Sequence, residues 1–143
     1  MKITICSSLD FISQIKEISE KLGKMGHFVL LPRTAEMVIK GSLSQEDILK
    51  EKQTGDIVNR MIRQDAIKKH FEKIKNSDGI LVLNFEKKGV KNYIGGAVFL
   101  EIGFAHVLGK KIFLLNPVPE VSYKDEILAM RPVVIYRDLE EIS

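Results

Sequence analysis

The chain has 143 residues, of which 45% are hydrophobic and 29% are charged, with a formal net charge of +3. This length fits one domain with its own core, and the mild charge does not demand a nucleic-acid partner but suits a small anionic ligand better than a cationic one. The single cysteine, Cys6, excludes an intramolecular disulfide. No apolar run approaches the roughly 18 residues of a membrane span, and no signal-peptide pattern opens the chain, so we expect a cytoplasmic protein without a membrane partner.

The first elements form a predicted strand–helix–strand unit. Residues 2–6 are a β-branched run and residues 28–31 are a second apolar run, so both are predicted strands. Apolar residues recur at helical spacing between them, over residues 11–22, with Ser8 or Asp10 as the candidate cap. Such a unit favours parallel strands joined by a right-handed crossover.

The turn after the first strand contains Cys6, Ser7 and Ser8. Ligands bind beyond the carboxyl ends of the strands in parallel sheets, so these side chains are candidate ligand contacts. A serine-rich turn is also ordinary turn chemistry, and both interpretations stay open.

Residues from about 33 to 55 are polar and have no clear period. A capping pattern at Ser44–Asp47 predicts a short helix that ends before Gly55. We therefore expect a helical or flexible insert, which acts as a lid, an oligomer contact or a mobile flap.

A longer helix is predicted over residues 56–75, because Ile67, Phe71 and Ile74 form an apolar stripe. His70 lies beside that stripe. A histidine at the edge of an apolar face is either structural and half-exposed or functional, and the sequence alone supports both.

Residues 80–83 are an apolar strand of the buried parallel type, and Asn84 follows it. Asn84 is a candidate ligand contact or an ordinary strand stop. The next loop carries Lys87, Lys88 and Lys91, which can steer a phosphate or simply form a solvated surface.

Residues 92–117 are the most informative stretch, and they predict a loop, a helix opened by Gly95 and Gly96, and a strand over 112–115. Between Ala97 and Ala105 every residue is apolar or glycine except Glu101, which shares the helix's apolar stripe. An ionised carboxylate on a buried face is costly unless it is paired or used in chemistry. Glu101 therefore interacts with the positive end of the helix dipole or pairs with a lysine, or it is an active-site carboxylate. In the last case it lies behind a loop whose glycines let a ligand approach the backbone.

The remaining pattern predicts a short helix over 125–130, a strand over 133–135 and a helical turn over 138–142. The alternation predicts one domain, residues 1–143, of the α/β class: a three-layer, flavodoxin/Rossmann-like five-stranded parallel sheet with helices on both faces. The histidines are scattered and no phosphate-loop or dinucleotide fingerprint follows a strand, so we expect no metal and no cofactor.

Four motifs, ITICSSLD, SDGILVLN, GG…FLEIGFA and KKIFLLNP, resemble the nucleoside 2-deoxyribosyltransferase superfamily, which includes the 2'-deoxynucleoside 5'-phosphate N-hydrolases. The resemblance covers most of the chain except residues 33–54, and its most specific part surrounds Glu101. It implies that Glu101 is a nucleophile that attacks the anomeric carbon of a nucleoside or nucleotide and displaces the base. A second base or water then resolves the sugar ester.

The resemblance also implies that Ser7, Ser8 and Leu9 line a nucleoside pocket and that Gly95 and Gly96 approach the 5' end. The full set of expected substrate contacts is Cys6, Ser7, Ser8, Leu9, Asn84, Asn92, Tyr93, Gly95 and Gly96. Members of the superfamily are typically dimers or higher oligomers, so a homodimer is expected.

Two residues depart from the superfamily pattern. His70 takes the place of an aspartate, which implies a hydrogen-bond or proton donor, a changed substrate, or a lost activity. Leu128 takes the place of a serine that the phosphate-using hydrolases contribute from a neighbouring subunit, which weakens strict specificity for monophosphates. The alternative function is therefore a catalytically inactive nucleotide-binding or sensing module of the same fold.

Overall fold

The computed structural model describes all residues, 1–143, and has the predicted α/β architecture. One sheet of five parallel strands runs in the order β2-β1-β3-β4-β5. The strands are β1 (Lys2–Cys6), β2 (Phe28–Leu30), β3 (Gly79–Val82), β4 (Lys111–Leu114) and β5 (Val133–Val134). Gly79 begins β3 directly beside Lys111, and a Cβ there would come within 2.8 Å of the Lys111 carbonyl oxygen. Only glycine lets these two strands pair at that register.

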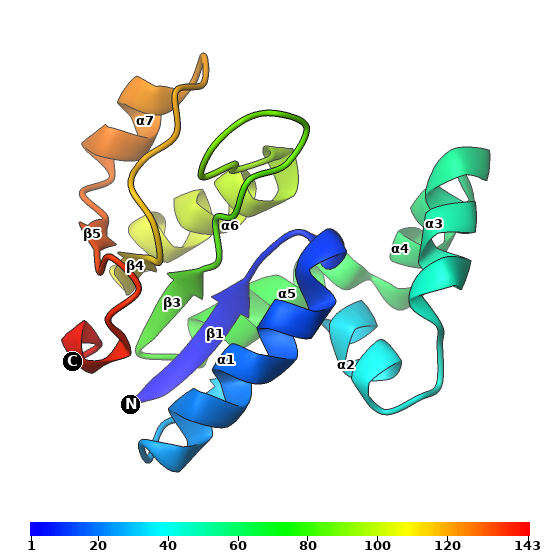
Figure 1. The fold of residues 1–143 in the computed structure, drawn as a ribbon, viewed down its shortest axis with the longest axis horizontal. Helices are drawn as coiled ribbons and strands as arrows, with labels where there is room; N and C mark the ends of the chain where they lie inside the picture. The colour runs from blue at the N-terminus through cyan, green and yellow to red at the C-terminus, as the bar shows by residue number, and fades with distance from the viewer.

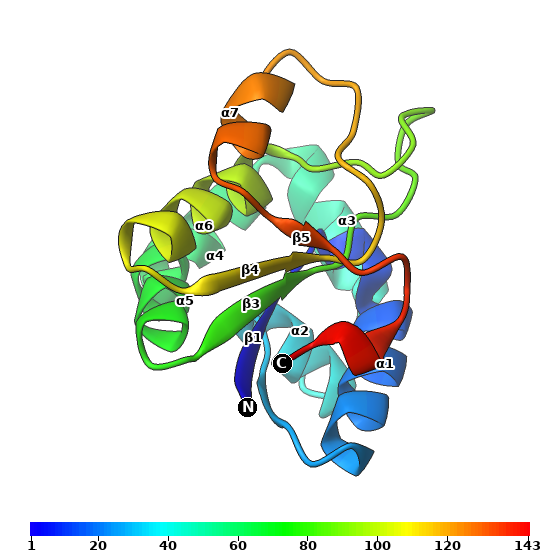
Figure 2. The ribbon, with the colours of Figure 1, turned by 90° about the vertical axis from the view of Figure 1, so that its left-hand side faces the viewer.

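Helices cover both faces of the sheet (Figures 1 and 2). On one face, Ile3 and Ile5 pack with α1 (Ile12–Lys24) in a core that also includes Ile142. On the other face, Cys6 belongs to a second core with α5 (Ala66–Lys75), α6 (Gly96–Val107) and α7 (Lys124–Ala129). Successive side chains of a strand point to opposite faces, so Cys6 lies on the face of α5 and α6.

Short 3-10 turns complete the chain at residues Leu9–Phe11 and Leu139–Glu141. Ser8, rather than Asp10, caps the first of them, because its hydroxyl accepts a hydrogen bond from the Asp10 backbone N–H. The predicted strand ends differ from the observed ones by at most one residue. No helix has both the length and the apolar character needed to cross a bilayer.

The segment that lacked a period is helical, as α2 (Arg33–Ile39) and α3 (Gln45–Thr54). Ser44 and Asp47 form the capping box at the start of α3, as the sequence pattern predicted. With α4 (Asp56–Gln64), α3 stands to the side of the sheet (Figure 1). Arg60 of α4 donates to the Glu51 carboxylate of α3, with Nε to Oε2 at 2.6 Å, and this pair ties the two helices together.

The prediction of one helix over residues 56–75 is wrong. The chain breaks between α4 and α5 at Asp65, whose φ of 48° is in the left-handed region. Aspartate tolerates this conformation better than most residues, so the break needs no glycine. Ile67 is 52% exposed and therefore leaves the predicted buried stripe, whereas His70 and Ile74 are buried.

Candidate active site

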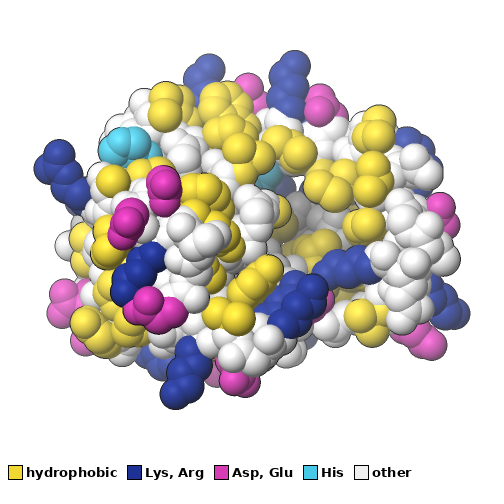
Figure 3. Space-filling view, turned by 90° about the horizontal axis from the view of Figure 1, so that it is seen from above, with side chains coloured by type: hydrophobic (Ala, Val, Ile, Leu, Met, Phe, Trp, Pro, Cys, Tyr) yellow, Lys and Arg dark blue, Asp and Glu magenta, His cyan; other side chains and the backbone are white.

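A cavity of about 410 Å³ lies beyond the carboxyl end of β1. Its walls come from the turn after β1, from α5 and α6, and from the helices of residues 33–64, so the insert closes one side of it. Figure 3 looks into this hollow, which is bordered by apolar and basic side chains. This volume is within the range of small-ligand sites, about 300–1,000 Å³.

Glu101 projects from α6 into the wall of this cavity. Its side chain is only 17% exposed, and its one ionic partner is His70, with Glu101 Oε2 3.0 Å from His70 Nε2. No lysine or arginine pairs with it. The helix dipole acts most strongly in the first turn of a helix. Because α6 begins at Gly96, Glu101 lies beyond that turn. Neither the helix dipole nor a lysine partner therefore accounts for this buried carboxylate.

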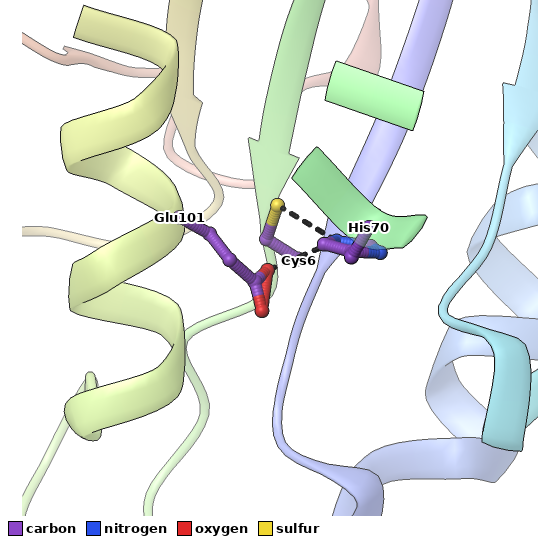
Figure 4. Close-up of side chains that lie close together, drawn as sticks. All are labelled: Cys6, His70 and Glu101. Carbon is purple, nitrogen blue, oxygen red and sulfur yellow. Dashed lines mark hydrogen bonds and ion pairs between the residues drawn. The ribbon is translucent and has the colours of Figure 1, made fainter. Parts of the chain in front are cut away.

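His70, from α5, contacts both Glu101 and Cys6 (Figure 4). Its side chain is buried rather than half-exposed, and its Nε2 is 3.5 Å from the Cys6 Sγ. Burial raises the pKa of the Cys6 thiol, and the Glu101 carboxylate raises that pKa further, so the thiol is protonated at neutral pH. We call Cys6, His70 and Glu101 the three-residue cluster.

The three-residue cluster is incompletely hydrogen-bonded. The 3.0 Å contact between His70 and Glu101 is not aligned as a hydrogen bond, so Glu101 Oε2 has no hydrogen-bond partner although it is buried. The other ring nitrogen of His70, Nδ1, is also buried without a partner. Unpartnered buried polar atoms of this kind are uncommon and point to strain, chemistry or a missing ligand.

Basic side chains from separate segments stand at the cavity wall. Arg33, Lys52 and Lys87, which we call the basic rim, line the cavity, whereas Glu101 is the only carboxylate that does. Asp10 holds two of them, with its carboxylate oxygens 2.8 Å from Lys52 Nζ and 3.0 Å from Lys87 Nζ. Burial alone would raise the pKa of Asp10, but the hydrogen bonds from both lysines outweigh it and hold that pKa below its ordinary value.

Lys87 links the basic rim to the serine turn and to the glycine loop. Its Nζ donates to Ser8 Oγ at 2.9 Å and lies 5.6 Å from the centre of the Tyr93 ring. A Cβ at Gly95 would come within 3.1 Å of that same ring. Gly95 is therefore needed for Tyr93 to pack beside the start of α6.

Most of the predicted site residues meet at this one cavity. Ser7, Ser8, Leu9, Tyr93, Gly95 and Gly96 line it together with His70 and Glu101. Cys6 is fully buried and reaches the site through His70 instead of lining the cavity.

Asn84 and Asn92 do not line the cavity. The Asn84 amide donates to the backbone oxygens of Asn116 and Pro117 at 2.8 and 3.0 Å and accepts from the Asn116 N–H at 2.9 Å. Asn84 therefore links the loop after β3 to the loop after β4, as expected of an ordinary strand stop. Asn92 has a φ of 57° and shapes a turn.

The sequence did not indicate the cavity residues of the insert and of α4. They are Arg33, Thr34, Lys52, Ile57 and Met61. The only signal in the sequence was indirect, the amphipathic pattern of α4. In the structure α4 buries none of its residues, which is typical of a helix whose apolar face is turned to a cavity or a partner.

No protein-family model matches the sequence, and a search of curated proteins also finds no match. Among solved structures, a 2-deoxyribosyltransferase from Bacillus psychrosaccharolyticus is similar to this chain with a TM-score of 0.52 and 20% identity, over 80% of this chain and 71% of that chain. The chain shares its fold with that enzyme. A CMP N-glycosidase from Clostridium botulinum is also similar, with a TM-score of 0.46 and 17% identity, over 94% of this chain and 85% of that chain. The shared fold agrees with the α/β architecture that the alternation of strands and helices predicted.

Proposed function

We propose that the protein cleaves or exchanges the N-glycosidic bond of a nucleoside or nucleotide through a covalent sugar ester on Glu101. One observation carries this proposal: a largely buried carboxylate, without a lysine or arginine partner, faces a cavity of ligand size. A poorly solvated carboxylate of this kind is suited to attack a carbon that carries positive charge in the transition state. The similarity in fold to a 2-deoxyribosyltransferase supports the same chemistry.

In the first step, a Glu101 oxygen bonds to the anomeric carbon while the bond from that carbon to the base nitrogen breaks. The base leaves with the bonding electrons and takes up a proton. His70 is the titratable side chain beside Glu101 that lines the same cavity, so we assign it as the proton donor.

In the second step, water or a second base attacks the same carbon from the opposite side, gives its proton to His70 and releases Glu101. Attack by water gives hydrolysis, and attack by a base gives exchange. Both outcomes retain the anomeric configuration, because two displacements occur at one carbon.

The basic rim favours an anionic substrate, a nucleotide rather than a nucleoside. Three cations and a single carboxylate line the cavity, and the acids that pair with these cations, Asp10 and Glu36, do not line it, so a phosphate group entering the cavity meets mainly basic side chains. Lys87 is already positioned by Ser8 and Asp10, so it needs little reorganisation to accept a phosphate.

The alternative is a catalytically inactive nucleotide-binding module, and the position of His70 favours it. A lasting ion pair across the 3.0 Å contact would hold the Glu101 carboxylate away from a sugar. Such a module would be stabilised by nucleotide, by about 2.7 kcal/mol at 100 times the dissociation constant, without releasing any base.

We also propose that the protein is a homodimer or a higher oligomer. Val58 and Ile62 of α4 and Ile67 of α5 are 56%, 72% and 52% exposed, and large apolar side chains gathered on neighbouring helices favour burial in an interface. Light scattering after size exclusion tests this directly, and a monomer at micromolar concentration would contradict it.

The activity is tested by incubating the protein with deoxynucleosides and with their 5'-monophosphates, with and without a free acceptor base, and separating the products by chromatography. We expect release or exchange of the base, lost in Glu101→Gln and kept in Glu126→Gln, which changes an exposed glutamate of α7. Turnover that survives in Glu101→Gln refutes the assignment of the nucleophile. Binding without turnover in the unaltered protein supports the inactive module.

A further inference from the structure

Three kinds of metal ligand meet in the three-residue cluster, although the sequence spacing gave no sign of a metal site. The Cys6 thiol ends β1, the His70 imidazole comes from α5, and the Glu101 carboxylate comes from α6 (Figure 4). One donor atom from each lies within 4.8 Å of the other two. The fold, not the local sequence, brings them together.

Two of the three donor separations are close to those of a zinc site. Cys6 Sγ is 3.5 Å from His70 Nε2, which in turn is 3.0 Å from Glu101 Oε2. Zinc bonds of about 2.3 Å to sulfur and about 2.0–2.2 Å to nitrogen and oxygen, at tetrahedral angles, place the ligand atoms roughly 3.3–3.6 Å apart. The third pair, Cys6 Sγ and the Glu101 carboxylate, lies within 4.8 Å, so side-chain rotations that shorten this separation would bring all three donors to a common centre.

The hydrogen bonding of the cluster also points to a ligand. Glu101 Oε2 faces His70 and is buried without a hydrogen-bond partner, and the fully buried Cys6 thiol lies against His70 and the Glu101 carboxylate. A cation placed between the three donors would satisfy the carboxylate oxygen and the sulfur together.

We propose that Cys6, His70 and Glu101 bind one Zn²⁺ ion. Thiolate, imidazole and carboxylate together suit this borderline-soft cation better than Mg²⁺ or Ca²⁺, which prefer oxygen ligands. His70 and Glu101 line the cavity, so the fourth position faces it and is filled by water or by a ligand. On binding, the thiol loses its proton to solvent, and the charge of the metal stabilises the buried thiolate.

Zinc and sugar transfer would then exclude one another. A Glu101 oxygen that is bonded to the metal is not available to attack the anomeric carbon, so zinc would act as a reversible inhibitor. This consequence rests on the proposed function, whereas the binding of zinc does not.

The test uses the full chain freed of metal with a chelator, and its main readout needs no substrate. We expect Co²⁺ to bind with a stoichiometry of one and to give the thiolate-to-cobalt charge-transfer absorption in the near ultraviolet, which Zn²⁺ then displaces. Cys6→Ser should lose that absorption and bind Zn²⁺ at least tenfold more weakly in competition with a chromophoric chelator. His106→Ala, which changes an exposed histidine on α6, should behave as the unaltered protein.

Absence of stoichiometric Co²⁺ binding, or a charge-transfer absorption that survives in Cys6→Ser, overturns the zinc site. Circular dichroism shows whether Cys6→Ser is folded. If it is not, Glu101→Gln takes its place and should weaken Zn²⁺ binding at least tenfold. An inactive protein that binds Zn²⁺ keeps this inference and overturns only the proposed function.

Discussion

Replacement of Glu101 by glutamine should make the protein more stable while it abolishes activity. The carboxylate is 83% buried by side-chain area, since 17% is exposed, and its Oε2 has no hydrogen-bond partner. A buried polar group in this condition costs about 1–3 kcal/mol. Glutamine has nearly the same shape but no charge, so we expect Glu101→Gln to raise the free energy of unfolding by about 1–2 kcal/mol.

The opposite result follows if Glu101 and His70 form a structural ion pair. Removing one partner of a buried pair typically costs 3–5 kcal/mol, because the other charge is left uncompensated. The two explanations of the 3.0 Å contact thus predict changes of opposite sign. This makes stability, measured without any substrate, a test of what the carboxylate is for.

Urea unfolding followed by circular dichroism measures the difference, and thermal unfolding should show a shift of roughly 3–5 °C per kcal/mol for a chain of this size. Glu36→Gln is the matched control, because the Glu36 carboxylate is similarly shielded, with 24% exposed, but is 2.8 Å from Lys73 Nζ. We expect that control to lose up to about 1 kcal/mol. A loss above about 1 kcal/mol in Glu101→Gln refutes the reasoning.

Three further predictions concern the core, the rim and the thiol. Ile102→Ala, which empties a fully buried position on α6, should cost about 2–5 kcal/mol in urea unfolding, and a cost below 1 kcal/mol would contradict the packing described. Lys87→Ala should raise KM for nucleoside 5'-monophosphates at least tenfold but leave KM for nucleosides nearly unchanged, and equal effects on both would disprove a phosphate contact. Burial raises the pKa of Cys6, so the folded state favours the neutral thiol. The resulting stabilisation is complete below the ordinary thiol pKa, about 8.5, and is lost as pH rises toward the folded-state pKa. The stability difference between the unaltered protein and Cys6→Ala should therefore shrink from about pH 8 to pH 10, and a constant difference would show that ionisation of the thiol plays no part.

The elements with strong periodicity could be predicted from the sequence. Continuous apolar runs mark the buried strands, and the apolar stripe through Val98 and Ala105 placed Glu101 toward the interior, where the structure also has it. The break at Asp65 could not be predicted in the same way. A helical period continues across a single left-handed residue, and aspartate is common inside and outside helices.

The composition of the site was only partly predictable. Strand alternation places Cys6 on the opposite face from Ile5, but which helices cover that face depends on the strand order, so its contact with His70 is a tertiary result. Lys52 comes from a segment with little apolar pattern, and only the folded insert brings it to the cavity. Side chains that meet through loops and insert helices carry no periodic signal.

The most direct test of the proposed chemistry is to trap the sugar ester on Glu101. The protein is mixed with a deoxynucleoside 5'-monophosphate, quenched in acid within milliseconds to seconds, digested and examined by mass spectrometry. We predict a deoxyribosyl phosphate adduct on the peptide that contains Glu101, absent in Glu101→Gln. Release of base with no adduct at any quench time, together with inversion of the anomeric configuration in the sugar product, would contradict a covalent intermediate.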